Sequence, residues 1–590
     1  MVPSTLDPAH PDAAPAVRPP DTSLDAIDAD LAVLEAHKTE WARLPVPVRR
    51  DLLRGLRERT LERAGRWVTA ASRAKGLAVD TPLRGEEWSS GPWSVLNYLS
   101  LLDRTLAHIE AGTLDRLVAG RIRQRPDGQT IVRVVPDGVY DQIFFSGYQM
   151  DIWMQPGVTP DTLVDTMAVA YRDPDPAGAV SAVLGAGNLT AIPPLDLLYK
   201  LYAENQVAVL KLNPVNSYVG PILEDIFADF VERGYVRFVY GGADVGEALT
   251  RHDAVDEIHV TGSATTHDAI VFGTGADGAR RKAADEPAID KRVTSELGGV
   301  GPVVVVPGDW SEPDLRFHAE NVASMKLHNS GFNCVAAQVL VLPEAWPQRE
   351  AFLAELRAVL AEIDGRPAYY PGADARRTDV EEAYPQAESI GPGWTLVPDV
   401  PPDAGEYALT TEFFGPILAV TALPGGGPDE DPADWLDRAV TFCNESVAGT
   451  LGVNLLVHPR TRAALGSRLE DAISRLRYGT VAINVWTGGA FLLGQAAWGA
   501  FPGHERTDIQ SGSGVVHNAL LFDRPQKSVL SGPFAPFPRS LLLGERHTSP
   551  TPLWFVTNET AGVTARRLTA FAAAPSPLAL PGILASALRG

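Results

Sequence analysis

The chain has 590 residues, more than the usual limit of about 250 to 300 residues for a single hydrophobic core, so we expect two or more domains. Its net charge of -22 argues against a nucleic-acid partner, because a polyanion would be repelled. The two cysteines, Cys334 and Cys443, are too few for a disulfide-stapled secreted fold, so we expect a reducing, cytoplasmic environment.

The N-terminal part predicts a disordered segment followed by helices. Residues 1–22 are rich in Pro, Ala and Asp and have too little apolar content to pack. They lack a basic region followed by an apolar core, so we expect no signal peptide, and no later run is apolar enough to predict a membrane span. From Leu24 onward, and again after Pro47, apolar residues recur with helical spacing. We expect these helices to pack on the domain that follows.

Two extended segments are predicted between residues 125 and 176. IVRVV (131–135) and YDQIFF (140–145) are rich in β-branched and aromatic residues and are separated by Pro and Gly. We expect a hairpin-like excursion from the main body of the chain here.

From residue 180 onward, short apolar runs alternate with helical stretches, which predicts a parallel, doubly wound sheet. The runs cover residues 180–185, 207–212, 236–240 and 257–260. Ligands bind such sheets beyond the carboxyl ends of the strands, where Asn188, Lys211 and the pair Gly262-Ser263 are located. The sequence GTGADG (273–278) matches a dinucleotide fingerprint, but too few residues follow it for a complete βαβ unit, so we interpret it as a glycine-rich loop.

The stretch from Thr294 to Leu340 contains the strongest candidates for chemistry. Residues 303–306 predict a buried strand and residues 315–327 an amphipathic helix. Cys334 follows Asn-Ser-Gly at a predicted helix start, where backbone N–H groups and the helix dipole would favour the thiolate. Because the thiolate is the nucleophilic form, Cys334 is the candidate nucleophile.

Beyond residue 340 we predict a second α/β unit, with apolar runs at 416–423 and 452–457, and a segment at 479–488 that returns towards the first unit. The tail from 531 to 590 is rich in Pro and Leu, and we expect it to wrap around a neighbouring subunit. Contact of its end with a membrane surface is less favoured, because Arg589 is its only cation.

No metal site is predicted. His252, His259 and His267 lack the i, i+3 or i+4 spacing that places two ligands on one helix face.

Five ordered matches between residues 180 and 530 resemble the aldehyde dehydrogenase superfamily. They are the pair SELGG (295–299) with NSGFNC (329–334), the segment 185–214 beginning GAGN, the segment 241–263 ending in Gly-Ser, EFFGP (412–416), and the closing segment 511–530. The resemblance implies an α/β fold with a Rossmann-like, doubly wound cofactor domain, a second α/β catalytic domain and a small oligomerisation excursion.

The same resemblance implies a division of the chain. The parts are a disordered segment (1–22), a cofactor-binding domain (23–294) with the excursion within about 125–176, a catalytic domain (295–485), a return to the cofactor domain with the closing segment (486–530), and a C-terminal extension (531–590).

Three residues acquire catalytic roles from the resemblance. Cys334 would attack an aldehyde to form a thiohemiacetal, which becomes a thioester after hydride transfer. The amide of Asn188, with the backbone N–H of Cys334, would hold the oxyanion. Glu296 would deprotonate the water that releases the carboxylic acid. We therefore expect a small-molecule aldehyde as substrate, and a homodimer or homotetramer.

NAD or NADP is the implied cofactor. Lys211 suits the adenosine ribose or a 2′-phosphate, Gly262 and Ser263 at a helix start suit the pyrophosphate, and Glu412 suits the nicotinamide ribose hydroxyls. Gly298 is placed with these cofactor contacts.

Several positions depart from the family pattern. Pro214 stands where the family usually has an acid, so NADP becomes at least as plausible as NAD. His267, Phe332 and Gly187 replace a usual Gly, Gln and Trp, and the substrate is therefore left open.

Two alternatives remain. A CoA-acylating dehydrogenase or acyl-CoA reductase shares the thioester, but such enzymes generally lack the base that Glu296 supplies. A non-catalytic scaffold with the same fold would have no reason to keep Cys334, Glu296 and Asn188 together.

Overall fold

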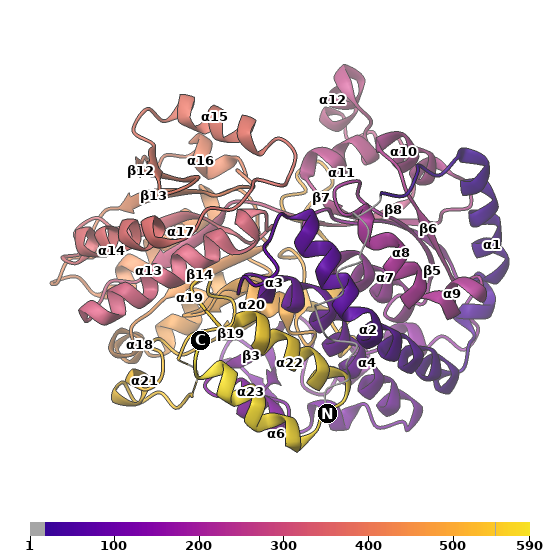
Figure 1. The fold of residues 1–590 in the computed structure, drawn as a ribbon, viewed down its shortest axis with the longest axis horizontal. Coiled ribbons are helices and arrows are strands. Elements are labelled where there is room, and N and C mark those ends of the chain that lie inside the picture. Colours follow the sequence, from indigo (N-terminus) through magenta and orange to yellow (C-terminus); the bar gives the residue numbers. More distant parts are fainter. Residues whose placement is uncertain (1–17, 549) are drawn as a thin grey trace.

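The computed structural model describes residues 18–548 and 550–590, and two large β-sheets organise this part of the chain (Figure 1). The smaller sheet has the strand order β17-β8-β7-β4-β5-β6. Its strands are β4 (Val180–Leu184), β5 (Val207–Lys211), β6 (Val236–Val239), β7 (Glu257–Gly262), β8 (Arg292–Leu297) and β17 (Gly512–Ser513). All neighbours are parallel except β17, which pairs antiparallel with β8. The predicted parallel sheet is confirmed, with its first four strands at the predicted runs.

Helices cover the smaller sheet and explain its apolar runs, because a strand buried on both faces needs no polar side. Helices α1 (Leu24–Ala42), α7 (Ile192–Tyr202) and α10 (Ala243–Arg251) pack directly on its strands. The other helices of this half are α2 (Val46–Ala74), α4 (Ser94–Glu110), α8 (Gly220–Ile226), α9 (Ala228–Glu232), α11 (Ala264–Val271) and α12 (Gly275–Ala283). Of the segment predicted to be disordered, residues 1–17 lie outside the described residues, and Thr22 pairs with Tyr240.

The larger sheet has the order β1-β2-β3-β19-β15-β14-β9-β10-β13-β12-β11. Its strands are β1 (Ile122–Gln124), β2 (Thr130–Val135), β3 (Gln149–Met154), β9 (Gly301–Val305), β10 (Ala337–Pro343), β11 (Glu388–Ile390), β12 (Trp394–Val400), β13 (Ile417–Leu423), β14 (Gly452–Leu456), β15 (Thr480–Ile483) and β19 (Pro525–Ser531). β15 lies inside this sheet, so the segment at 479–488 does not return to the smaller sheet as predicted. That return comes later, where β17 pairs with β8.

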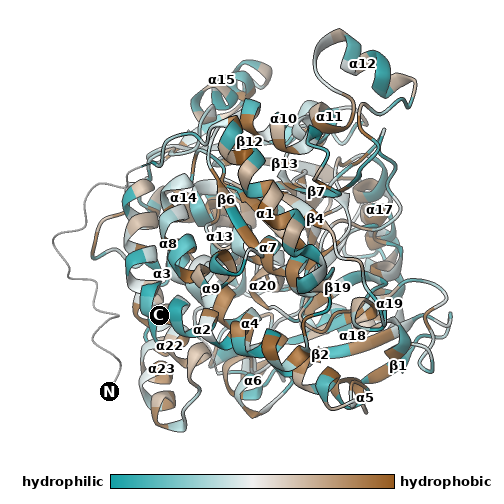
Figure 2. Cartoon of the chain, turned by 90° about the vertical axis from the view of Figure 1, so that its right-hand side faces the viewer, coloured by the Kyte–Doolittle hydropathy of each residue, from teal (hydrophilic) through white to brown (hydrophobic). Residues whose placement is uncertain are grey.

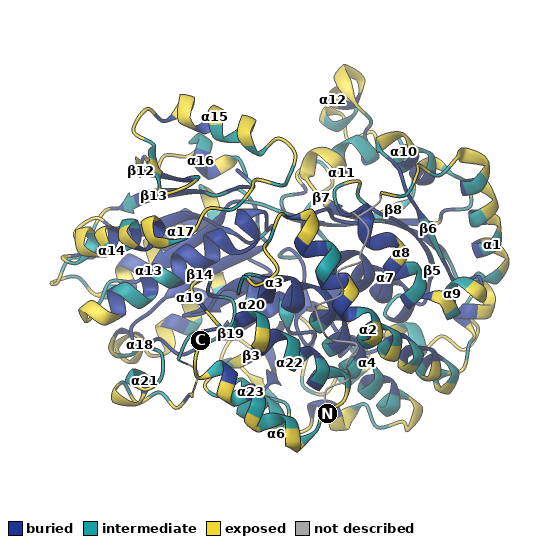
Figure 3. Cartoon of the chain, in the orientation of Figure 1, coloured by how far each residue is buried: buried dark blue, intermediate teal, exposed yellow. Residues whose placement is uncertain are grey.

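The helices of this half are α13 (Glu312–Leu327), α14 (Arg349–Glu362), α15 (Ala373–Ala383), α16 (Tyr407–Thr410), α17 (Pro432–Glu445), α18 (Pro459–Leu465), α19 (Ser467–Arg475) and α20 (Thr487–Leu492). A separate short pair joins β16 (Ala497–Trp498) to β18 (Val516–His517). Figure 3 shows the strands of both sheets among the buried residues, whereas exposed residues gather on outer helices such as α12 and α15.

The excursion predicted near residues 125–176 contains β2 at the predicted place, but its second extended segment is wrong. Residues 139–144 form helix α6 (Val139–Phe144). Tyr140 and Phe144 are one helical turn apart, and both rings contact Phe571, with ring centroids 4.9 and 5.0 Å away. In a strand, which rises about 3.3 Å per residue, the two side chains would start about 13 Å apart and could not both pack closely on one ring.

The C-terminal tail packs on its own chain, and its contact with a neighbouring subunit stays a prediction. Helix α22 (Ala561–Ala573) lies against α3 (Arg84–Trp88), α4 and the π-helical turn Ser89–Trp93, and α23 (Leu580–Ala587) packs on α22 (Figure 1). A Cβ on Gly85 would lie 2.7 Å from the backbone carbon of Ala561, so glycine permits this close approach. Figure 2 shows hydrophobic and hydrophilic residues mixed along α22, as in a helix packed on one side.

Candidate active site

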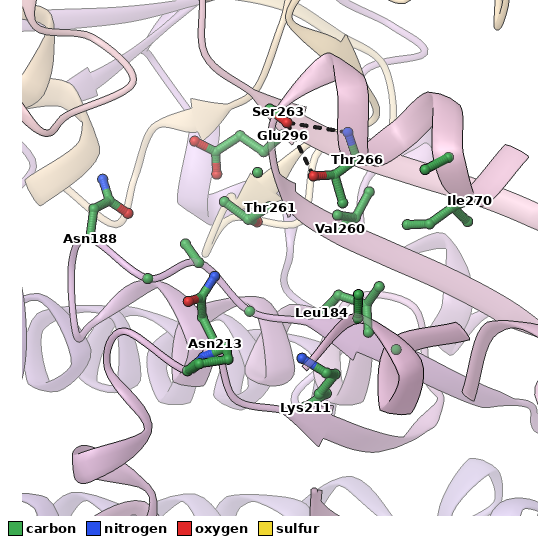
Figure 4. A pocket seen from close by; sticks show the side chains of 18 of the residues that line it. Leu184, Asn188, Lys211, Asn213, Val260, Thr261, Ser263, Thr266, Ile270 and Glu296 are labelled. Atoms are coloured by element: carbon green, nitrogen blue, oxygen red, sulfur yellow. Dashed lines mark hydrogen bonds between the residues drawn. The ribbon is translucent and has the colours of Figure 1, made fainter. Parts of the chain in front are cut away.

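A cavity of about 640 Å³ opens where the carboxyl ends of the parallel strands β4, β5, β7 and β8 face the loop before β10. All eight residues proposed from the sequence line it, namely Asn188, Lys211, Gly262, Ser263, Glu296, Gly298, Cys334 and Glu412. Its volume lies within the range of about 300 to 1,000 Å³ that is common for small-molecule sites. Figure 4 shows Asn188 and Lys211 on separate parts of the cavity wall.

Cys334 lies in a turn between a short 3-10 helix (His328–Gly331) and β10, not at a helix start as predicted. Asn329, Ser330 and Gly331 all have positive φ, and this tight bend ends the helical path of α13 before the cysteine. Gly331 is required there, because a Cβ would lie 2.5 Å from the carbonyl oxygen of Gly415. The thiol is partly exposed in the cavity.

The surroundings of Cys334 favour the thiol, whereas the sequence predicts that they favour the thiolate. Burial, followed by the negative charges of Glu296 and Glu412, raises its pKa well above the usual value. No helix dipole is in place to offset these effects. A neighbouring base must therefore accept the proton before the sulfur can act as a nucleophile.

Glu296 is the candidate for that base. It ends β8, and the thiol of Cys334 donates to its Oε1 over 3.6 Å. The indole N–H of Trp498 donates to the same oxygen at 2.7 Å. Burial and the charge of Asp196 raise the pKa of Glu296 to about 8, against the lowering effect of the Trp498 and Cys334 hydrogen bonds. A carboxyl group with this pKa can exchange protons near neutral pH.

Asn188 joins the strand-end loop of β4 to the loop that carries Cys334. Its side-chain nitrogen donates to the carbonyl of Phe332 at 2.9 Å, and its own carbonyl accepts from the hydroxyl of Tyr369 at 3.1 Å. An amide nitrogen carries two N–H groups, so one donor remains for a ligand. The residue before Asn188 must be glycine, because a Cβ at position 187 would lie 2.7 Å from Oδ1 of Asn213.

Lys211 and Ser263 occupy the part of the cavity near α10 and α11. Lys211 ends β5, and burial lowers its pKa, although Asp244 and Asp21 act in the opposite direction. Its amine makes no hydrogen bond within the described part of the chain, which leaves it available to a ligand. Ser263 caps α11 by accepting from the backbone N–H of Thr266 at 3.2 Å (Figure 4). Helix α11 forms although His267 replaces the usual glycine.

Glu412 and Gly298 meet between the two sheets. A Cβ on Gly298 would lie 2.2 Å from Oε1 of Glu412, so glycine is needed to admit the carboxylate. Burial raises the pKa of Glu412 to about 8, against the effects of Lys326 and Arg376. Its Oε1 is buried and has no hydrogen-bond partner among the described residues. The unpaired carboxylate oxygen and the free Lys211 amine are features that fit a polar cofactor such as a dinucleotide.

Sequence reasoning missed Trp498 and Asp196. Asp196 is the one acidic residue in the otherwise largely apolar helix α7, and a buried acid in such a helix could have indicated a functional role. Trp498 gave no signal, because its hydrogen bond to Glu296 joins residues that are 202 positions apart in the sequence.

The described residues contain no group of three or more His, Cys, Asp or Glu side chains placed to hold a metal ion. Within the same residues, no helix is both long and apolar enough to cross a membrane.

The aldehyde dehydrogenase family model matches residues 164–499, more than half of the chain. The chain belongs to the aldehyde dehydrogenase family. This confirms the family resemblance and, at family level, the predicted enzyme class.

Two curated relatives illustrate how divergent this aldehyde dehydrogenase family member is. The chain is 27% identical to N-succinylglutamate 5-semialdehyde dehydrogenase of Sphingopyxis alaskensis, over 42% of this chain and 52% of that protein. It is 25% identical to coniferyl aldehyde dehydrogenase of a Pseudomonas species, over 58% of this chain and 72% of that protein. The first match thus spans about half of the relative's length.

Solved structures of the family share the fold. The NAD-dependent aldehyde dehydrogenase of Sinorhizobium meliloti superposes with a TM-score of 0.57 at 17% identity, covering 87% of each chain. The NADP-dependent glyceraldehyde-3-phosphate dehydrogenase of Bacillus halodurans, complexed with NADP, also gives 0.57 at 17% identity, covering 87% of this chain and 92% of that one. The predicted α/β fold class is confirmed.

Proposed function

We propose that this protein oxidises an aldehyde to a carboxylic acid through a thioester on Cys334, with NAD or NADP as hydride acceptor. One observation carries the proposal: the thiol of Cys334 contacts Glu296 in a cavity that Asn188 also lines. Family membership supports it, because relatives carry names of aldehyde dehydrogenases that act on different aldehydes.

The residues of the chain supply the steps in order. Glu296 takes the proton of Cys334, and the sulfur attacks the aldehyde carbon to give a thiohemiacetal. The free N–H of the Asn188 amide and the backbone N–H of Cys334 hold the oxyanion. When bound, the nicotinamide supplies the hydride acceptor that turns the thiohemiacetal into a thioester. Glu296 then takes a proton from water, and the resulting hydroxide releases the acid.

The cofactor contacts follow from the cavity wall. Lys211 would hold the adenosine ribose or a 2′-phosphate, Gly262 and Ser263 the pyrophosphate, and Glu412 beside Gly298 the nicotinamide ribose. The acids Asp244 and Glu247 near Lys211 favour a free 2′-hydroxyl, whereas Lys211 itself favours a 2′-phosphate. The first activity assay should therefore include both NAD and NADP.

We also propose that the parts of the chain around the two sheets have different roles. The part around the smaller sheet binds the cofactor, and the part around the larger sheet carries the nucleophile. Strands β1–β3, at the edge of the larger sheet, contact a second copy in a homodimer or homotetramer. Light scattering after gel filtration measures the mass of the assembly, and a monomer would contradict this last point.

The deciding assay supplies an aldehyde panel with NAD or NADP, with and without CoA. We expect NAD(P)H and carboxylic acid without CoA, and no product from Cys334→Ser. Strict dependence on CoA would replace the proposal by a CoA-acylating dehydrogenase. A complete lack of turnover and of covalent acyl-enzyme would favour the scaffold.

A further inference from the structure

The proposed mechanism makes Glu296 accept two protons in each turnover, one from the Cys334 thiol and one from water. The Cys334 sulfur takes one of these protons back when it leaves the thioester. Glu296 is 2% exposed, so the other proton needs a route out of the cavity wall. The route described below rests on the proposed function.

A ladder of polar side chains runs from Glu296 to the outer end of the smaller sheet. Strands β7 and β8 pair Thr261 with Glu296, His259 with Thr294, and Glu257 with Arg292. Because alternate residues of a strand share one face, these six side chains lie on the same face of the sheet. A parallel sheet covered by helices normally has apolar side chains there, so the polar ladder calls for an explanation.

Helix α7 adds two ionisable groups to this ladder. Asp196 and Lys200 lie one helical turn apart and are 0% and 1% exposed. The hydroxyl of Thr261 donates to Asp196 at 2.8 Å, and Lys200 donates to Thr294 at 3.2 Å. Helix and sheet are therefore joined by hydrogen bonds where apolar packing would be expected.

The contacts are continuous in the middle of the ladder. Nε2 of His259 lies 3.6 Å from Oδ2 of Asp196 and 3.3 Å from the hydroxyl of Thr261. Nδ1 of His259 lies 3.0 Å from the hydroxyl of Thr294, which accepts from Lys200. Histidine can take a proton on one ring nitrogen and release one from the other, so it suits this central place.

The outer end reaches solvent. Lys200 donates to Glu204 at 2.7 Å, and Glu204 and Arg292 have side chains that are 15% and 59% exposed. Lys200 and Arg292 hold the pKa of Glu257 at about 2 although burial alone would raise it. Glu257 therefore stays ionised and anchors Lys200, while Glu204 is the group that meets water.

The inner end reaches the base. Oε2 of Glu296 and Oδ1 of Asp196 are both buried, and neither has a hydrogen-bond partner among the described residues. The charge of Asp196 acts on Glu296 and contributes to its raised pKa. Both oxygens are therefore available to accept a proton or a hydrogen bond from water.

We propose that Asp196, His259, Thr294 and Lys200 form a proton relay that carries the proton of Glu296 to Glu204 at the edge of the sheet. The O–H bond of Glu296 breaks as one forms on Asp196, and Asp196 passes a proton to Nε2 of His259. Lys200 gives a proton to Glu204, and the neutral amine that remains takes the hydroxyl proton of Thr294 as that oxygen takes the Nδ1 proton of His259. One proton moves along the chain and no electrons are transferred.

The test removes one hydroxyl. Thr294→Val keeps the shape of the side chain but breaks the relay, and Thr294→Ser keeps the hydroxyl. Thr480→Val is the matched control, because Thr480 is 0% exposed in β15 and its hydroxyl has no partner among the described residues. His259→Gln is the second variant, since an amide can form hydrogen bonds but does not titrate.

The readouts are the first-turnover burst of NAD(P)H, which needs only one proton on Glu296, and the steady-state rate, which needs that proton to leave. We expect Thr294→Val and His259→Gln to keep a burst of about one NAD(P)H per site and to lose about tenfold or more in steady-state rate. They should also show a larger solvent deuterium isotope effect. Thr294→Ser should recover most of the rate.

Unchanged steady-state rates in both variants would overturn the relay. Equal loss of burst and steady-state rate, together with a lower melting temperature than Thr480→Val, would overturn it in favour of a structural network. A wild-type protein that gives no NAD(P)H with any aldehyde would instead overturn the proposed function, and the relay with it.

Discussion

Trp498 donates its indole N–H to Oε1 of Glu296 at 2.7 Å, and this hydrogen bond holds the carboxylate beside the thiol of Cys334. The donor also favours the ionised form of a buried acid whose pKa is otherwise raised. Trp498 is thus a positioning residue that acts through Glu296.

Trp498→Phe tests this relationship. A hydrogen bond to a charged group contributes about 1.5 to 3 kcal/mol, so its loss should move the rising limb of the pH–rate profile up by about one to two units. Trp435→Phe is the control, because the indole N–H of Trp435 is buried and has no partner in the described part of the chain. An unchanged midpoint would contradict the positioning role.

The pH dependence of turnover follows from Glu296. Burial raises its pKa to about 8, and only the ionised form accepts a proton, so kcat should rise with pH through about 8 and level off above. Glu296→Gln should lower kcat by about two orders of magnitude or more and remove this inflection. The measurement is kcat from pH 6 to 10, and a rate that falls across this range would contradict the assignment.

Cys334 should be alkylated slowly at pH 7. Its pKa is raised by burial and by Glu296 and Glu412, so iodoacetamide should react more slowly than with a small free thiol, and faster as the pH rises. Mass spectrometry locates the label, with Cys334→Ser as the control for the buried Cys443. Labelling faster than a free thiol at pH 7 would favour the resting thiolate that the sequence predicts.

A buried ion pair supports the loop that carries Cys334. Glu86 accepts from Arg366 at 2.7 and 2.6 Å and from the backbone N–H of Asn329 at 2.9 Å. Arg366→Met leaves Glu86 unpaired and should cost about 3 to 5 kcal/mol of unfolding free energy. Arg316→Met, which breaks an exposed pair with Glu362, should cost less than about 1 kcal/mol. Equal losses of unfolding free energy in the two variants, measured by urea denaturation, would contradict this prediction.

The same pair predicts a response to acid. Although burial acts in the opposite direction, Arg366, His328 and the backbone N–H of Asn329 lower the pKa of Glu86 from 4.5 to about 2. A lowered carboxyl pKa gives stability that is complete above the unfolded value of 4.5 and lost as the pH falls towards 2. Glu86→Gln should therefore flatten the decline of the melting temperature between pH 4.5 and 2.

The parallel sheet and the placement of the candidate residues in one site could be predicted from the sequence. Apolar runs such as that of β5 are rich in β-branched and aliphatic residues, which is typical of buried strands. Lys211 could be predicted as a site residue because ligands bind at the carboxyl ends of the strands in such sheets. Motif order along the chain then placed Cys334 with Glu296, and both line the cavity.

Features that depend on tertiary packing could not be predicted. α6 is helical because Tyr140 and Phe144 pack on Phe571, far along the chain. The turn at Cys334 depends on Gly331 meeting Gly415. Helix and strand propensities describe short windows, and these contacts join segments that no window contains.

The contact between α22 and α3 has a consequence for how the protein is made. α3 carries Gly85, which contacts Ala561 of α22, and Glu86, which accepts a hydrogen bond from Asn329 in the loop that carries Cys334. The ribosome synthesises α22 long after it has synthesised Cys334. A nascent chain therefore lacks the packing of α22 that backs α3 until translation has passed residue 573.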